Sequence, residues 1–161
     1  MPIYMQIDGI KGDATQADHK DWMNIEAIHW NVSRSMKTNV GAAKNRESSE
    51  PSISEVVVTK VSDSSAAALF QQSVTGSGGK TVIIDLTTTG DPGKTYIRYT
   101  LQQALIANYT VNSSGDRPIE TIRLNFTHIE VKYTPLDQNN QPNGQNVASY
   151  SLVDGTGTST V

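Results

Sequence analysis

The opening stretch of the chain, from Ile3 to Val32, reads IYMQIDGIKGDATQADHKDWMNIEAIHWNV and decides the fold. Apolar and polar residues alternate from Ile3 to Ile7, which is the period of a β-strand with one buried face. After a polar connector, Met23 and Ile25 alternate with polar neighbours in the same way. The stretch therefore predicts a β-hairpin at the start of the chain.

The second strand of this hairpin changes phase halfway along. Its apolar positions resume one register later, at Ile28, Trp30 and Val32. A slip of one residue would turn every side chain to the wrong face, unless an extra residue is bulged out of the ladder. We therefore expect a bulge at Glu26-Ala27 and a buried Trp30. The residues on the opposite, polar face are then His29, Asn31 and Ser33.

The composition favours a β protein. The 161 residues include 26 Val and Ile but only 7 Leu, together with 17 Thr, and β-branched residues prefer strands. No apolar run approaches the roughly 20 residues of a membrane span, and the N-terminus lacks the features of a signal peptide. The net charge of −3 argues against general binding to nucleic acid or membrane surfaces. We expect one domain over residues 1–161.

Further strands follow from the same alternation. They are expected at Ile53–Val61, at Thr81–Thr88 and, after the hairpin turn at Asn143-Gly144, at Val147–Leu152. The alternating segment Ile97–Val111 is too long for a straight strand in a small domain. It should bend, or pass from one sheet to another, near Gln102-Gln103, with a short helix at Gln102–Ala107 as the alternative.

One more strand and one helix complete the prediction. Residues Ile119–Tyr133 form a strand whose phase changes at Thr127-His128, indicating a second bulge. The helix is expected at about residues 64–75, capped by Asp63 or Ser64 and ended by Gly76. Its apolar stripe, expected to cover one end of the sheet, consists of Ala66, Leu69, Phe70 and Val74. The predicted fold is mainly β, a compact β-barrel of two sheets and about seven to nine strands, with one short flanking helix.

Residues 34–52 form an extended loop with little apolar content. Its charged residues are Arg34, Lys37, Lys44, Arg46, Glu47 and Glu50, which give it a net charge of +2 against −5 for the rest of the chain. A basic arm on an acidic body is suited to contacting another copy, and a solvated loop is the alternative. The tail, residues 155–161, is expected to be frayed.

No motif indicates catalysis, a cofactor or a metal. The three histidines, His19, His29 and His128, lack the spacing of metal ligands and are expected at the surface. The two Gly-Lys-Thr triplets, Gly79–Thr81 and Gly93–Thr95, differ from a phosphate loop in spacing and context. No nucleophile elbow or carboxylate pair in an apolar setting is present. The chain is predicted not to be an enzyme.

Several segments, in order along the chain, resemble those of one protein family. They are IDGIKGD from Ile7, His19 followed by Trp22, IHWNV from Ile28, TKVSDSS from Thr59 and LNFTHIEVKYTP from Leu124. As an ordered set over Ile3 to Asp154, they resemble the Hcp family, the haemolysin-coregulated proteins that form the inner tube of the bacterial type VI secretion system. That family is related in fold to phage tail-tube proteins.

The resemblance implies a phage tail-tube-like barrel that assembles into hexameric rings. The rings would stack into a tube, expelled by a contracting sheath, that holds or chaperones small effectors. The implied partners are further copies of the chain, a spike protein at the tube tip, sheath and baseplate components, and secreted effectors, without nucleic acid or membrane insertion. Assembly would take place in the bacterial cytoplasm, and export would need no signal peptide.

Two sets of residues then become candidate sites. His29 and Asn31 are expected to face the lumen of the tube, and the charged residues of the loop are expected to mediate stacking between rings. The alternative function, from a different class, is a monomeric β-sandwich that binds carbohydrate or protein.

Overall fold

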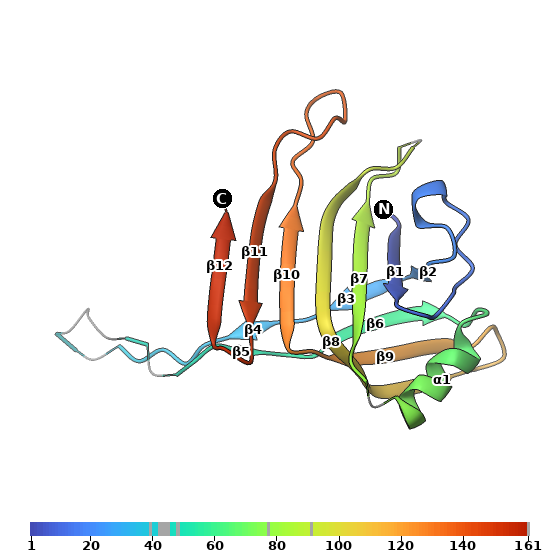
Figure 1. The fold of residues 1–161 in the computed structure, drawn as a ribbon, viewed down its shortest axis with the longest axis horizontal. Helices are drawn as coiled ribbons and strands as arrows, with labels where there is room; N and C mark the ends of the chain where they lie inside the picture. Colours follow the sequence, from blue (N-terminus) through green and yellow to red (C-terminus); the bar gives the residue numbers. More distant parts are fainter. Residues whose placement is uncertain (39, 42–45, 48, 77, 91, 161) are drawn as a thin grey trace.

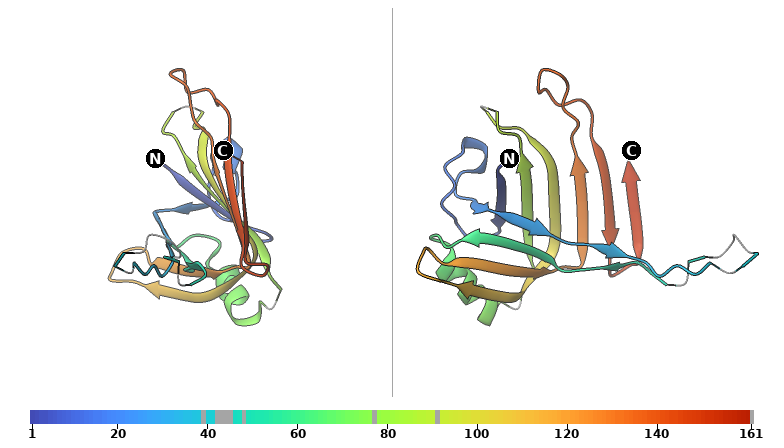
Figure 2. Two further views of the ribbon diagram at one scale, coloured as in Figure 1. Left: turned by 90° about the vertical axis from the view of Figure 1, so that its left-hand side faces the viewer. Right: turned by 180° about the vertical axis from the view of Figure 1, so that it is seen from behind.

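The computed structural model describes residues 1–38, 40–41, 46–47, 49–76, 78–90 and 92–160, and two antiparallel sheets dominate it (Figure 1). The larger sheet has the strand order β12-β11-β10-β8-β7-β1-β2. The smaller sheet contains β3, β6, β9 and the second half of β8. Figure 2 shows the two sheets meeting at a steep angle. The predicted mainly β fold with two sheets and one helix is confirmed.

The strand bounds are β1 (Ile3–Ile7), β2 (Met23–Ile25), β3 (Ala27–His29), β4 (Val32–Ser33), β5 (Ser52–Ile53), β6 (Val56–Val61), β7 (Lys80–Thr87), β8 (Thr95–Asn112), β9 (Ile119–Asn125), β10 (His128–Tyr133), β11 (Asn146–Ser151) and β12 (Thr156–Thr160). The described residues therefore form more strands than the seven to nine expected, because several predicted strands are divided into two or three and the tail adds β12. A single-turn 3-10 helix, η1 (Ala17–His19), lies in the connection between β1 and β2.

The longest strand, β8, belongs to both sheets. Its first half pairs with β7 and β10, and its second half pairs with β9. Between the halves, Gln103 has a φ of +51°, a left-handed conformation that is uncommon for a residue with a Cβ. The predicted bend with a change of sheet near Gln102-Gln103 is confirmed, and the alternative of a helix at Gln102–Ala107 is wrong.

The two phase changes in the sequence are also crossings between sheets. β2 pairs with β1 in the larger sheet, whereas β3, beginning one residue after β2 ends, pairs with β6 in the smaller sheet. In the same way, β9 pairs within the smaller sheet and β10 within the larger one. The positions predicted as bulges, Glu26-Ala27 and Thr127-His128, are therefore right. Their cause is different, because the chain changes sheet there.

The core lies between the two sheets. The larger sheet contributes Met5, Ile84 and Leu101, and the smaller sheet contributes Val58 and Ile122, all 0% exposed. Trp30, which the sequence places in the core, is only half-buried and packs against the edge of this cluster. It makes an edge-to-face contact with Tyr99 at a ring separation of 5.8 Å.

The one α-helix in the described residues, α1 (Ala66–Thr75), lies where the sequence predicts it. The backbone carbonyl of Asp63 accepts a hydrogen bond from the Ala66 N–H, and the helix ends at Gly76. Its stripe covers the sheet only in part, because Leu69 is fully buried while Phe70 and Val74 are exposed. Within the described residues, no helix has the length and apolar character needed to cross a membrane.

The end of the chain is not frayed over the residues that the structure describes. Thr156–Thr160 form β12, which pairs with β11 along its whole length. A hydrogen bond of 2.7 Å between the hydroxyls of Ser149 and Thr158 links the two strands further. The expectation of a frayed tail is therefore wrong for residues 156–160, because backbone pairing holds a segment that lacks apolar side chains. Val161 lies outside the described residues.

Candidate functional site

The predicted loop of residues 34–52 is a two-stranded arm in the part that the structure describes. At its base, β4 pairs with β5. Further out, Met36 and Glu47 pair through their backbones in an isolated antiparallel β-bridge. The Lys37 N–H donates a 2.6 Å hydrogen bond to the Arg46 carbonyl. The arm extends away from both sheets (Figures 1 and 2), and its described residues from Arg34 to Glu50 are exposed. Backbone pairing therefore gives this polar segment a defined direction.

The arm uses one of its cations internally. The Arg34 guanidinium lies 3.5 Å from the Glu47 carboxylate and donates a 3.1 Å hydrogen bond to the Ser49 carbonyl. These contacts join the two sides of the arm.

Two other cations of the arm face solvent. Lys37 and Arg46 are exposed, and neither makes an ion pair with another described residue. Glu50 is also exposed, and Lys44 lies outside the described residues. The arm therefore presents positive charge that its own body does not neutralise.

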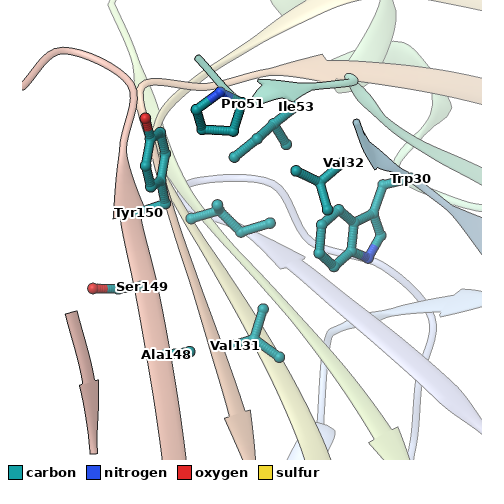
Figure 3. A pocket seen from close by; sticks show the side chains of 9 residues that line it. Trp30, Val32, Pro51, Ile53, Val131, Ala148, Ser149 and Tyr150 are labelled. Carbon is teal, nitrogen blue, oxygen red and sulfur yellow. The ribbon is translucent and has the colours of Figure 1, made fainter. Parts of the chain in front are cut away.

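An apolar pocket lies at the base of the arm (Figure 3). It has a volume of about 200 Å³ and is open to solvent. Its lining residues come from the arm base and the larger sheet: Trp30, Val32, Pro51, Ile53, Ile129, Val131, Ala148, Ser149 and Tyr150. Since almost all of the exposed wall is apolar, the pocket can accept an apolar side chain.

His29 and Asn31 lie on the polar side of the segment that leads into the arm. His29, at the end of β3, is exposed, whereas its neighbour Ile28 packs against the core. Asn31 exchanges two hydrogen bonds with Ser54, from its N–H to the Ser54 hydroxyl and from the Ser54 N–H to its carbonyl. Both residues thus face away from the core, as the alternation predicts, while a lumen position stays a prediction.

The sheets leave open edges. Among the described residues, β12 pairs only with β11, and β3 pairs only with β6. The residues of β12 are all exposed, and none is charged or Pro. An edge strand without such protection can pair with another chain. β12 is therefore a candidate contact between copies.

A buried polar cluster that was not predicted from the sequence lies on the outer face of the larger sheet. His19, expected at the surface, is 2% exposed, because η1 folds over the sheet there. Its Nε2 lies 2.8 Å from the Asp85 carboxylate and its Nδ1 lies 2.7 Å from the Gln16 side-chain oxygen. The ring stacks on Tyr4 and meets the edge of Trp22. The hydrogen-bonding capacity of this histidine is thus used within the fold.

Asp85 is the centre of this cluster. Its carboxylate is 0% exposed and accepts hydrogen bonds from Arg98 Nε (2.7 Å) and Nη2 (2.6 Å), with the Thr95 hydroxyl at 3.3 Å. The hydrogen bonds to Asp85 outweigh partial burial and raise the pKa of the Arg98 guanidinium above its usual value. A buried carboxylate therefore fixes Arg98 in one orientation.

A second buried cluster lies in the smaller sheet. The ammonium of Lys60, 0% exposed, donates to Glu120 (2.9 Å) and Asp63 (2.8 Å), and the Ser62 hydroxyl donates to Glu120. Burial would raise the pKa of Asp63, but hydrogen bonds from Lys60 and from the side chain and backbone of Ser65 hold it below its usual value. Burial, with a smaller contribution from Glu120, raises the pKa of Tyr109 to about 12.

A sequence signal for this second cluster existed. Lys60 shares the buried phase of β6 with Val56 and Val58, and Glu120 shares that of β9 with Ile122. Opposite charges at core positions of two strands indicate a buried pair. No signal of this kind marked His19, because its burial depends on how a polar connector folds.

Both clusters are satisfied internally. Every buried side-chain nitrogen and oxygen among the described residues has a hydrogen-bond partner. In the same part of the chain, no three His, Asp or Glu residues are grouped so that they could hold a metal ion. The arm, the apolar pocket at its base and the open edges, in contrast, face outward.

The comparisons with known proteins agree with this architecture. The family model described as "Type VI secretion system effector, Hcp" matches residues 4–133. None of the curated proteins matches the chain.

Solved structures share the fold at low sequence identity. One, titled "Structure of a type six secretion system protein", has a TM-score of 0.88 at 22% identity, covering 98% of this chain and 99% of the other. Hcp1 from Salmonella typhimurium has a TM-score of 0.79 at 19% identity, covering 98% of each chain. A type VI secretion system effector from Yersinia pestis has a TM-score of 0.73 at 23% identity, covering 92% of this chain and 98% of the other. Since the family match spans most of the sequence, the chain belongs to the Hcp family of type VI secretion system effectors.

Proposed function

We propose that this chain is a structural, self-assembling protein of a type VI secretion system, without catalytic activity. Six copies close into a ring, and the rings stack into the expelled inner tube that holds small effectors. Its further partners are the spike protein at the tip and the sheath and baseplate components. The tube assembles in the bacterial cytoplasm and is then expelled from the cell.

The arm is the observation that carries this proposal. It projects from the body, and it leaves Lys37 and Arg46 without ion-pair partners among the described residues. The arm has a net charge of +2, and the rest of any neighbouring copy has a net charge of −5. Opposite charges on two surfaces favour and orient association. The arm is therefore suited to contacting the next ring.

The open edges support closure of the ring itself. Repeated contacts of one edge with a different surface of the next copy close into a ring when the rotation between copies permits it. The exposed edge of β12 would be covered in such a ring. His29 and Asn31 would then lie on the wall of the central channel.

Electron microscopy and light scattering of the purified protein test the ring. We expect particles with a central hole and a scattering mass of six copies. A single species of 17.5 kDa at high micromolar concentration and moderate salt would contradict the proposal.

A charge reversal tests the role of the arm. The variant Lys37→Glu/Arg46→Glu should keep its rings but form fewer or shorter tubes, because like charges now meet at the ring-to-ring contact. The matched control Lys11→Glu/Lys20→Glu changes the charge by the same amount on the exposed connector between β1 and β2. Loss of the rings in the arm variant alone would show that the arm closes rings rather than stacking them.

The variant His29→Asp tests the channel wall. Intact rings with altered retention or secretion of some effectors are expected, since each ring would carry six introduced carboxylates. Passage of every effector at the normal rate, or a His29 on the outer surface of the assembled ring, would contradict the lumen assignment.

The apolar pocket at the base of the arm favours a second candidate function, a monomeric module that binds carbohydrate or protein. Trp30 and Tyr150 offer aromatic surface there (Figure 3). This function requires a monomer in solution whose ligand binding is lost in Trp30→Ala. Rings in the microscope would exclude a lone module.

A further inference from the structure

A second pocket lies on the outer face of the larger sheet and differs in chemistry from the apolar one. It has a volume of about 240 Å³. It is lined by two strands, β8 and β10, and by the connection between β10 and β11, through Thr95, Arg98, Lys132, Thr134, Pro142 and Gln145. Arg98 precedes Tyr99 on β8, and Lys132 follows Val131 on β10. Because Tyr99 and Val131 pack against the core, the side chains of Arg98 and Lys132 point to the opposite face of the sheet.

Arg98 is held ready to bind an anion. A guanidinium has five N–H donors, and Asp85 engages the edge formed by Nε and Nη2. The edge formed by Nη1 and the second Nη2 hydrogen makes no hydrogen bond to another described residue. Because Asp85 is 0% exposed and also bound to His19, the orientation of Arg98 is set from beneath the pocket. The side chain of Arg98 is 39% exposed, so its available edge can reach a ligand.

Lys132 adds a second positive charge. It lies directly opposite Arg98 in the pairing of β8 with β10. Like charges in that position repel each other. Glu130 is the nearest carboxylate along β10 on the same face, yet no ion pair to Lys132 is found among the described residues. Asp85 pairs with Arg98 and not with Lys132, so within the part of the chain that the structure describes one positive charge of the pocket has no counter-ion.

We propose that this pocket binds a carboxylate, supplied by an acidic side chain of a protein partner. The planar fork of Arg98 matches a carboxylate with two parallel hydrogen bonds, and Lys132 supplies the counter-charge. The hydroxyls of Thr95 and Thr134 and the amide of Gln145 line the remaining walls. The volume lies below the range of pockets that enclose a whole small molecule. This suits one side chain on an open sheet face. Such binding at this pocket does not depend on the proposed tube function.

Thermal unfolding with defined probes tests this pocket at pH 7 and constant ionic strength. The probes are an end-blocked Gly-Glu-Gly peptide, its Gly-Gln-Gly counterpart, acetate and inorganic phosphate, each compared with chloride. We expect the Glu peptide at several times its Kd to raise Tm by about 2–4 °C, whereas the Gln peptide has no effect. NMR of the Arg98 guanidinium Nη–H groups reports the same binding at the edge that would contact the ligand.

Variants locate the effect. Lys132→Gln should lose the rise in Tm and the shift of the Arg98 signal, while the control Lys20→Gln, an exposed lysine outside this pocket, should keep both. An unchanged rise in Lys132→Gln would overturn the assignment. A larger effect of phosphate than of acetate would overturn the carboxylate preference, and binding of acetate without the Glu peptide would overturn the protein source.

Discussion

The substitution Lys60→Met tests how much the buried ammonium group of Lys60 stabilises the fold as the counter-ion of buried carboxylates in the smaller sheet. Lys60 and Glu120 are directly opposite each other on β6 and β9, and their side chains are 0% and 1% exposed. Met keeps most of the volume of the lysine stem, so the change removes the charge and leaves little cavity. What remains is a buried carboxylate without a counter-ion.

The expected cost follows from that geometry. Removing one partner of a buried ion pair typically costs about 3–5 kcal/mol, because the other charge is left desolvated and uncompensated. Lys60 makes hydrogen bonds of 2.8 and 2.9 Å to two carboxylates, which supports the upper half of that range. Proteins of this size lose about 2–4 °C of Tm for each kcal/mol, so the variant should melt about 8–20 °C lower.

Urea unfolding, followed by circular dichroism, measures the effect. The single variants Lys60→Met and Glu120→Gln and the double variant form a cycle, and the double variant should recover at least about 1 kcal/mol relative to the sum of the singles. All samples need one protein concentration, since association adds to apparent stability. The control is Lys11→Met, which breaks a surface pair with Asp21 and should cost about 0–1 kcal/mol. A Lys60→Met protein within about 1 kcal/mol of the wild type, or strict additivity in the cycle, would refute the reasoning.

Three further outcomes are expected. The pKa of Tyr109 is about 12 in the fold and about 10 when unfolded, so stability present below pH 10 should be lost as the pH rises toward 12. Tyrosine absorbance measures the ionisation and Tm measures the loss of stability. Ionisation of Tyr109 near pH 10 in the folded protein would contradict the expectation. Trp30→Ala should lower the free energy of unfolding, measured in urea, by about 2–3 kcal/mol. This is less than the loss for a fully buried Trp, because the side chain is half-buried. A loss above that range would indicate deeper burial. Gly12→Ala should lower the free energy of unfolding by about 1–3 kcal/mol, because the new Cβ would lie 2.5 Å from the Trp22 carbonyl oxygen. An unchanged Tm would show that the connector between β1 and β2 can move to make room for the methyl group.

The strands and the helix could be predicted because burial follows the periodicity of the sequence. The alternation located β1 and β2, and the helical spacing of Leu69 with its neighbours located α1. Even the phase changes were visible at the right residues. Their meaning was not, because a bulge and a change of sheet leave the same one-residue slip in the pattern.

The polar clusters and the tail could not be predicted in the same way. His19 is buried by a connector whose path depends on contacts with Tyr4 and Asp85, far apart in the sequence. β12 has no apolar residue to reveal it, since its pairing rests on backbone hydrogen bonds. The direction of the arm likewise comes from backbone pairing. Periodicity indicates which side chains of a strand or helix are buried. These features depend instead on backbone pairing and on contacts between residues far apart in the sequence.

The continuous strand β8 has a mechanical consequence. Its 18 residues run without interruption from the larger sheet into the smaller one, so the two sheets share a covalent backbone as well as a packed interface. The arm leaves the body from the smaller sheet through β3, which is paired with β6 and, through it, with β9 and β8. A pull on the arm is therefore transmitted through these ladders along β8 into the larger sheet. Separating the sheets under load would require shearing the β8 ladders, whose hydrogen bonds would have to break together.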